Sequence, residues 1–190
     1  MSKFNQFPDY QSLESGSQGA PAKANRSIPD RVKDYDLMNY ITPTAKVLDL
    51  GCNRGFFGVY LSPNIHSYVG IDSDANQIHY GVNEISKRRI KNMTLHNREF
   101  FCINQKFDVI LCLSFHSYVG ISMWEFAKCL MDMLNPKGYL FLEGHPRGYR
   151  EEPDKYWNPL TSYLYQNLIE IKSKFVTDRE LKRPFVLFQK

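Results

Sequence analysis

The sequence predicts an α/β fold built on a doubly wound, mostly parallel sheet with an antiparallel strand pair at its C-terminal end. Apolar, strand-like runs alternate with helical segments along most of the 190 residues, which is the order that a parallel sheet requires. The run at 46–50 ends in a glycine-rich turn that leads into a helix. The run at 108–113 is almost wholly apolar, as a central strand buried on both faces should be.

The N-terminal part divides into an arm and the start of a folded domain. Residues 1–28 are polar and rich in Ser, Gln, Gly and Pro, without an apolar period, so we expect a flexible arm. Three aromatic residues in this arm favour a lid that closes over a ligand. The domain is expected to span 29–190, with a first helix from Pro29 to about Ile41.

Three strands and two helices are expected next. They are a strand at 46–50, a helix at about 56–61, a strand at 67–71, a helix at 75–90 and a strand at about 93–96. In the second of these helices, Ile78, Val82 and Ile85 have helical spacing and are expected to face the core.

The second half of the domain repeats this alternation and then closes the sheet. The strand at 108–113 is followed by a helix at 122–134, which Ser122 and Glu125 open as a capping box. A further strand is expected at 139–143. The runs 168–174 and 184–188 are expected to form the antiparallel pair.

The turn after the first strand has the composition of a ligand site. Gly51 and Gly55 allow the backbone to approach a ligand closely, and Asn53 tolerates a left-handed backbone better than most residues. Asp72 follows about 20 residues later, where a carboxylate can accept hydrogen bonds from ribose hydroxyls. An open α/β sheet binds nucleotide-like ligands at such a strand-to-helix turn.

Two cofactor classes use this geometry. The dinucleotide fingerprint G-x-G-x-x-G, begun at Gly51, requires glycine at positions 53 and 56, where this chain has Asn53 and Phe56. The spacing resembles instead the first motif of the class I S-adenosylmethionine (SAM)-dependent methyltransferases, which have a Rossmann-like fold. The resemblance continues to the C-terminus through three later segments, 106–114, 134–143 and 183–188.

This resemblance implies a methyltransferase that uses S-adenosyl-L-methionine and releases S-adenosyl-L-homocysteine. In that family the turn holds the methionine end of the cofactor, the second-strand acid holds the ribose, and residues after the third strand flank the adenine. The cofactor residues that it implies are Asp49, Gly51, Cys52, Asn53, Gly55, Asp72, Ser73, Arg98, Glu99 and Ser114. No metal site is expected, because the four cysteines lack metal-ligand spacing.

Candidate residues for the methyl acceptor follow the fourth and fifth strands, at the carboxyl ends where open sheets bind ligands. His116 or His145 is a candidate general base, Glu143 precedes the second histidine, and Arg147 is a candidate anion contact. These four residues are the catalytic candidates. A base is needed only if the acceptor keeps a proton at neutral pH, so a hydroxyl needs one and a phosphate oxygen does not.

A second resemblance bears on the acceptor. Segments 51–55, 111–114, 142–146 and 183–188 are similar to those of methylphosphate capping enzymes, which methylate a terminal phosphate of RNA. The chain departs from them at Ser117–Tyr118, where those enzymes carry Lys-Trp. The acceptor classes that stay open are a small molecule, a saccharide, a phosphate-bearing compound and a nucleic acid. A non-catalytic partner subunit with the same fold is the competing interpretation.

Charge and hydropathy bear on the kind of acceptor and on the localisation of the protein. The formal net charge of +4 favours anionic acceptors only slightly. No run approaches the ~20 apolar residues of a membrane span, and no charged segment followed by an apolar core marks a secretory signal. The sequence therefore predicts a cytoplasmic protein without a membrane span.

Overall fold

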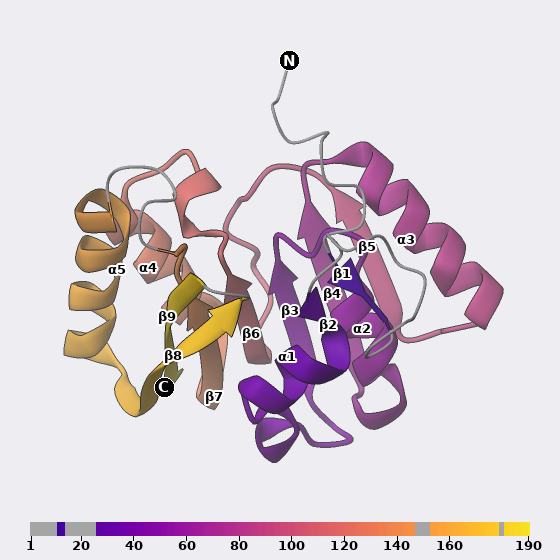
Figure 1. Ribbon diagram of the computed structural model, residues 1–190, viewed down its shortest axis with the longest axis horizontal. Coiled ribbons are helices and arrows are strands. Elements are labelled where there is room, and N and C mark those ends of the chain that lie inside the picture. Colours follow the sequence, from indigo (N-terminus) through magenta and orange to yellow (C-terminus); the bar gives the residue numbers. More distant parts are fainter. Residues whose placement is uncertain (1–10, 14–25, 147–152, 179–180) are drawn as a thin grey trace.

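The computed structural model describes residues 11–13, 26–146, 153–178 and 181–190. It has the expected α/β architecture, with a seven-stranded sheet in the order β5-β4-β3-β6-β7-β9-β8 (Figure 1). The strands are β3 (Lys46–Leu50), β4 (Ser67–Asp72), β5 (Met93–Asn97), β6 (Phe107–Leu113), β7 (Leu134–Glu143), β8 (Ile169–Asp178) and β9 (Leu181–Gln189). The strands from β3 to β7 are parallel, whereas β9 runs antiparallel to both β7 and β8.

Helices cover both faces of this sheet. On one face, α1 (Ile28–Asp34) and α2 (Phe56–Leu61) pack in one apolar core with alternate residues of the central strands, such as Val47 and Val109, and Ile85 of α3 (Ala75–Arg88) reaches the same core. On the other face, α4 (Met123–Met133) and α5 (Pro153–Asn167) pack against Leu48 and Ile110. Successive strand residues thus enter opposite cores, as period-two geometry requires.

The sheet changes direction between β3 and β6. The chain leaves β3 toward β4 and β5 and then returns to β6 on the other side of β3. Leu48 and Asp49 of β3 pair with Ile110 and Leu111 of β6, so the carboxyl ends of the two strands lie at the same edge. A crevice outside the carboxyl ends at such a point is where open α/β sheets bind ligands.

Several elements differ from their expected form. The first helix does not run to Ile41: α1 ends at Asp34, and Asp36 has a left-handed backbone (φ 54°) before a short 3-10 helix at Leu37–Tyr40. Val82 was expected in the core, but it is 46% exposed, because Ile78 and Gly81 form the buried stripe of α3. The helix α5 was not predicted at all.

Other expectations hold. Ser122 and Glu125 form the reciprocal capping box at the start of α4. Of the N-terminal arm, the structure describes residues 11–13 and 26–28, in which Gln11–Ser12 (β1) pairs with Arg26–Ser27 (β2) directly before α1. The idea that the arm closes as a lid stays a prediction. Within the described ranges, no helix is long and apolar enough to span a membrane.

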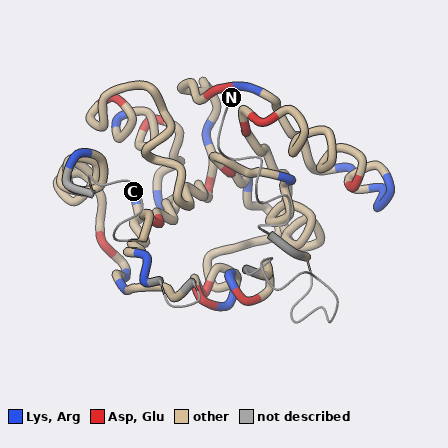
Figure 2. Tube along the Cα trace, turned by 45° about the horizontal axis from the view of Figure 1, so that its top comes forward, with Lys and Arg blue, Asp and Glu red and all other residues tan. Residues whose placement is uncertain are grey.

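The basic run 87–91 lies at the C-terminal end of α3. The other end of this helix, its N-terminus, is the one that follows β4. Figure 2 shows this group of basic residues at the tip of the long helix on the right. Lys87 and Arg88 contact Glu84 at 3.0 and 3.4 Å, one turn earlier in the same helix. Cations at a helix C-terminus also complement the helix dipole, so the run has a structural explanation.

Candidate active site

The turn between β3 and α2 is held in a left-handed conformation at three positions. Gly51, Asn53 and Gly55 have φ angles of 73°, 53° and 69°, so the expected left-handed role of Asn53 is confirmed. A Cβ atom at Gly51 would lie 2.7 Å from the ring of Phe115, and one at Gly55 would lie 2.8 Å from a methyl group of Leu95. Both glycines are therefore required by backbone geometry and by their neighbours.

Asp72 organises this turn from the end of β4. One carboxylate oxygen accepts a hydrogen bond from the backbone N–H of Asn53 at 2.8 Å, and the other accepts one from that of Asp74 at 2.9 Å. Burial raises the pKa of Asp72, and these backbone donors oppose the rise. A carboxylate has about four acceptor positions, so capacity remains for hydroxyl groups of a ligand.

Asp49 lies beneath the turn and is only 3% exposed. The hydroxyl of Tyr68 on β4 donates a hydrogen bond to it. Burial raises the pKa of Asp49 to about 6, while the Tyr68 hydrogen bond and the charge of Arg31 act in the opposite direction. Arg31, on α1, is itself buried, with its guanidinium 4.7 Å from the centre of the Phe57 ring.

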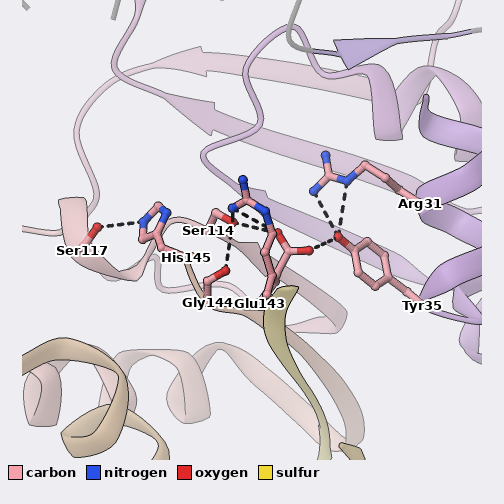
Figure 3. A network of polar contacts seen from close by, with 8 residues as sticks. Arg31, Tyr35, Ser114, Ser117, Glu143, Gly144 and His145 are labelled. Carbon is pink, nitrogen blue, oxygen red and sulfur yellow. Dashed lines mark hydrogen bonds and ion pairs between the residues drawn. The ribbon is translucent and has the colours of Figure 1, made fainter. Parts of the chain in front are cut away.

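Two histidines meet at the carboxyl ends of β6 and β7. The ring centres of His116 and His145 are 5.3 Å apart, and Trp157 of α5 packs edge-on against His116 at 5.6 Å. Nε2 of His145 lies 2.9 Å from the hydroxyl oxygen of Ser117, as Figure 3 shows. Tyr118, 40% exposed, contacts the His145 ring at 5.6 Å.

His116 combines burial with an unused polar atom. It is 3% exposed, and its Nδ1 is buried without a hydrogen-bond partner among the residues that the structure describes. Burial lowers its pKa from the ordinary value of 6.5 to about 4, so the imidazole is neutral near pH 7. A buried polar atom without a partner is uncommon in folded proteins, and a neutral imidazole nitrogen is able to accept a hydrogen bond.

Comparison with known proteins relates the central part of this chain to a protein family. A family model described as a methyltransferase domain matches residues 48–140, which run from inside β3 to inside β7 and include the whole turn and Asp72. Together with the fold, this match supports a SAM-dependent methyltransferase. SAM is the methyl donor of this family, and S-adenosyl-L-homocysteine is the product of its reaction.

Two curated proteins are similar to parts of this methyltransferase. An uncharacterised protein of Rickettsia prowazekii (strain Madrid E) is 33% identical over 108 residues, which cover 52% of this chain and 42% of that protein. A probable mRNA-capping enzyme of Acanthamoeba polyphaga mimivirus is 25% identical over 173 residues, which cover 70% of this chain and 14% of that protein. The chain thus spans less than half the length of these curated relatives.

Solved structures agree on the fold. The N-methyltransferase NodS from Bradyrhizobium japonicum WM9, in complex with S-adenosyl-L-homocysteine, has a TM-score of 0.69 at 16% identity, covering 92% of this chain and 93% of that chain. Coclaurine N-methyltransferase, bound to N-methylheliamine and the same product, has a TM-score of 0.67 at 12% identity, covering 94% and 76%. Identities this low support the fold and leave the acceptor open.

The residues present at the turn of the methyltransferase fit a SAM ligand. Its three left-handed residues give the tight turn that such a ligand requires, and the Asp72 carboxylate retains acceptor capacity for ribose hydroxyls. Ser73 follows on the exposed surface, Cys52 is buried beside the turn, and Arg98 and Glu99 are exposed after β5. The guanidinium of Arg98 stacks 3.7 Å from the centre of the Phe101 ring.

The other predicted site residues lie at the ends of β6 and β7, except for one that the structure does not describe. Ser114, expected at the cofactor, forms hydrogen bonds to Glu143 and Arg183. Glu143 is fully buried, and His116 and His145 lie together. Arg147 lies outside the described residues. Their individual roles stay predictions.

Sequence reasoning missed three residues that contact the candidate site: Arg31, Tyr35 and Trp157. Arg31 lies in α1, and Tyr35 is the residue that follows this helix. The hydroxyl of Tyr35 reaches Glu143 at the carboxyl end of β7, and Arg31 contacts that hydroxyl. Trp157 reaches His116 from α5. Of the three, only Trp157 left a signal: together with Leu160, Thr161 and Leu164 it has the spacing of a helix face.

Proposed function

We propose that this methyltransferase transfers a methyl group from SAM to a hydroxyl oxygen of a small molecule or saccharide. The observation that supports this most strongly is the buried Nδ1 of His116, which lacks a partner among the described residues and is neutral near pH 7 because burial lowers its pKa to about 4. A neutral imidazole nitrogen accepts a hydrogen bond from a hydroxyl and thereby orients the oxygen lone pair for attack.

The lowered pKa distinguishes among acceptors that carry a proton. When SAM is bound, its sulfonium supplies an electrophilic methyl group. An attacking hydroxyl becomes a protonated ether, which is a far stronger acid than an imidazolium with a pKa near 4, so His116 is basic enough to take that proton. An amine arrives as an ammonium at neutral pH and must lose a proton first, for which the same imidazole is too weak a base.

The polar groups around His116 also favour an uncharged acceptor. The described segments 113–118 and 143–146, which end β6 and β7, contain no Lys or Arg. Arg183, which donates to the Ser114 hydroxyl, lies 3.9 Å from the buried carboxylate of Glu143, which balances its charge. The rings of His145, Tyr118 and Trp157 supply apolar surface instead.

An acceptor panel tests the proposal. Transfer of isotope-labelled methyl from SAM would be measured with monosaccharides and phenols, primary amines, phosphate monoesters and 5′-phosphorylated RNA oligonucleotides. We expect labelled methyl ethers from at least one hydroxyl compound. Label found only in methyl phosphates or only in methylamines would contradict the proposal.

A terminal phosphate is the second candidate acceptor. It is supported by the Arg183–Pro184 pair in β9, which resembles the C-terminal end of the methylphosphate capping enzymes, and by the similarity to the mimivirus capping enzyme. An anionic oxygen needs no base, so this candidate requires arginine contacts rather than histidine. The resemblance would assign Arg147, Arg150 and Arg183 to the acceptor as anion contacts. Arg147 and Arg150 lie outside the described residues.

A further inference from the structure

A buried polar chain joins the N-terminal helix to the acceptor side of the sheet (Figure 3). Tyr35, the residue after α1, has no exposed surface, and its hydroxyl donates a hydrogen bond to Oε2 of Glu143 at the end of β7. Glu143 is also fully buried. Nε and Nη2 of Arg31 both approach the same hydroxyl at 3.4 Å. Residues 108 positions apart in the sequence therefore share one hydrogen bond.

Glu143 in turn determines how the chain leaves β6. Ser114, the first residue after that strand, has a left-handed backbone (φ 60°), which is uncommon for a residue other than glycine. Its backbone N–H donates to the carbonyl of Glu143 at 2.8 Å, and its hydroxyl donates to Oε1 of the same residue at 2.7 Å. Nη1 of Arg183 donates to the Ser114 hydroxyl at 2.8 Å.

These contacts bear directly on His116, which lies two residues after Ser114. A left-handed residue at the end of a strand sets the direction of the following loop, and here that loop places His116 between His145 and Trp157. If the Glu143 carboxylate turned away, Ser114 would lose the side-chain bond that opposes its backbone preference.

We infer that Tyr35 and Glu143 are positioning residues for the acceptor loop 114–118, so that the N-terminal helix forms part of the methyl-transfer site. The inference rests on the proposed function in taking His116 as the group that contacts the acceptor. Packing alone does not explain the pair, because a buried carboxylate is costly to desolvate and an apolar pair of similar size would fill the same space.

Tyr35→Phe tests the inference, because it keeps the ring that stacks on Phe185 at 5.0 Å and removes only the hydroxyl, which donates to Glu143 and accepts from Arg31. We expect kcat to fall about tenfold, as a lost hydrogen bond to a charged group implies, while calorimetric affinity for S-adenosyl-L-homocysteine stays at the wild-type value. Tyr139→Phe is the matched control: its hydroxyl accepts a hydrogen bond from Gln189 at the end of the β7–β9 pairing opposite to Glu143.

Two further measurements separate positioning from general stability. Amide hydrogen exchange in residues 113–121 should be faster in Tyr35→Phe than in wild type or in Tyr139→Phe, and this readout needs no acceptor. In a Glu143→Gln background, the additional loss of kcat caused by Tyr35→Phe should shrink, because the two residues act through one contact.

Three results would overturn the inference. They are wild-type kcat in Tyr35→Phe, unchanged exchange in residues 113–121, and a loss of cofactor affinity as large as the loss of kcat. The outcome is independent of the acceptor class: if the active acceptor proves to be a phosphate monoester, the hydroxyl proposal fails, and kcat on that compound together with the exchange data still decides the role of Tyr35.

Discussion

Replacing His116 with alanine should lower kcat for methyl transfer to a hydroxyl acceptor by roughly 10²–10⁴-fold, the usual effect of losing a general base. The residue supplies a buried nitrogen, Nδ1, that has no hydrogen-bond partner among the described residues. Affinity for S-adenosyl-L-homocysteine should change little, because the cofactor turn lies after β3 and not after β6. Steady-state kinetics and calorimetry on the same preparation separate the two effects.

Because alanine leaves a cavity at this buried site, His116→Phe provides a second variant that keeps an aromatic ring against Trp157. It should lose as much activity as the alanine variant. His79→Ala, on the exposed surface of α3, is the control and should behave as wild type. Near-normal rates in both His116 variants, together with large losses in Arg147→Ala and Arg150→Ala, would transfer the assignment to a phosphate acceptor.

Replacing Asp72 with alanine should weaken SAM binding by roughly 10- to 100-fold, since hydrogen bonds to a charged group contribute roughly 1.5–3 kcal/mol each. The structure gives two reasons for this loss of SAM affinity. The carboxylate is expected to hold the ribose, and it also fixes the turn through the backbone N–H of Asn53 and Asp74. Isothermal calorimetry with SAM measures the change.

Asp108→Ala is a closely matched control for Asp72. Its carboxylate likewise accepts two hydrogen bonds, from the backbone N–H of Lys46 at 2.8 Å and from the side chain of Asn135 at 2.7 Å, but at the opposite end of the sheet. It should lower thermal stability without lowering SAM affinity. Equal SAM affinity in Asp72→Ala and Asp108→Ala would remove the ribose assignment.

Features encoded by neighbouring residues could be predicted from the sequence. The strand runs, the left-handed turn at Asn53 and the capping box at Ser122 each depend on a few adjacent side chains and on local backbone preferences, and the structure contains all of them. Val82 was misplaced because helical spacing alone does not fix which side of an apolar stripe is buried. Gly81, which carries no hydrophobic signal, lies at the actual contact.

Features that depend on tertiary contacts could not be predicted in this way. The interior Pro159 and several residues of low helix propensity concealed α5, whose stability comes from packing of Leu160 and Leu164 on the sheet. Tyr35 was expected to be an ordinary helix residue, and nothing near it in the sequence indicates a partner 108 positions away. The histidine pair could be listed, but its burial and the lowered pKa of His116 appear only when α5 is in place.

Calorimetric titration of the wild-type chain with S-adenosyl-L-homocysteine tests the central claim most directly, because every proposed role assumes that the turn after β3 holds the cofactor. We predict a saturable isotherm that is strongly weakened in Asp72→Ala and preserved in Asp108→Ala. Absence of binding by the wild-type chain at millimolar ligand would contradict the account and would favour a non-catalytic partner subunit that shares the fold.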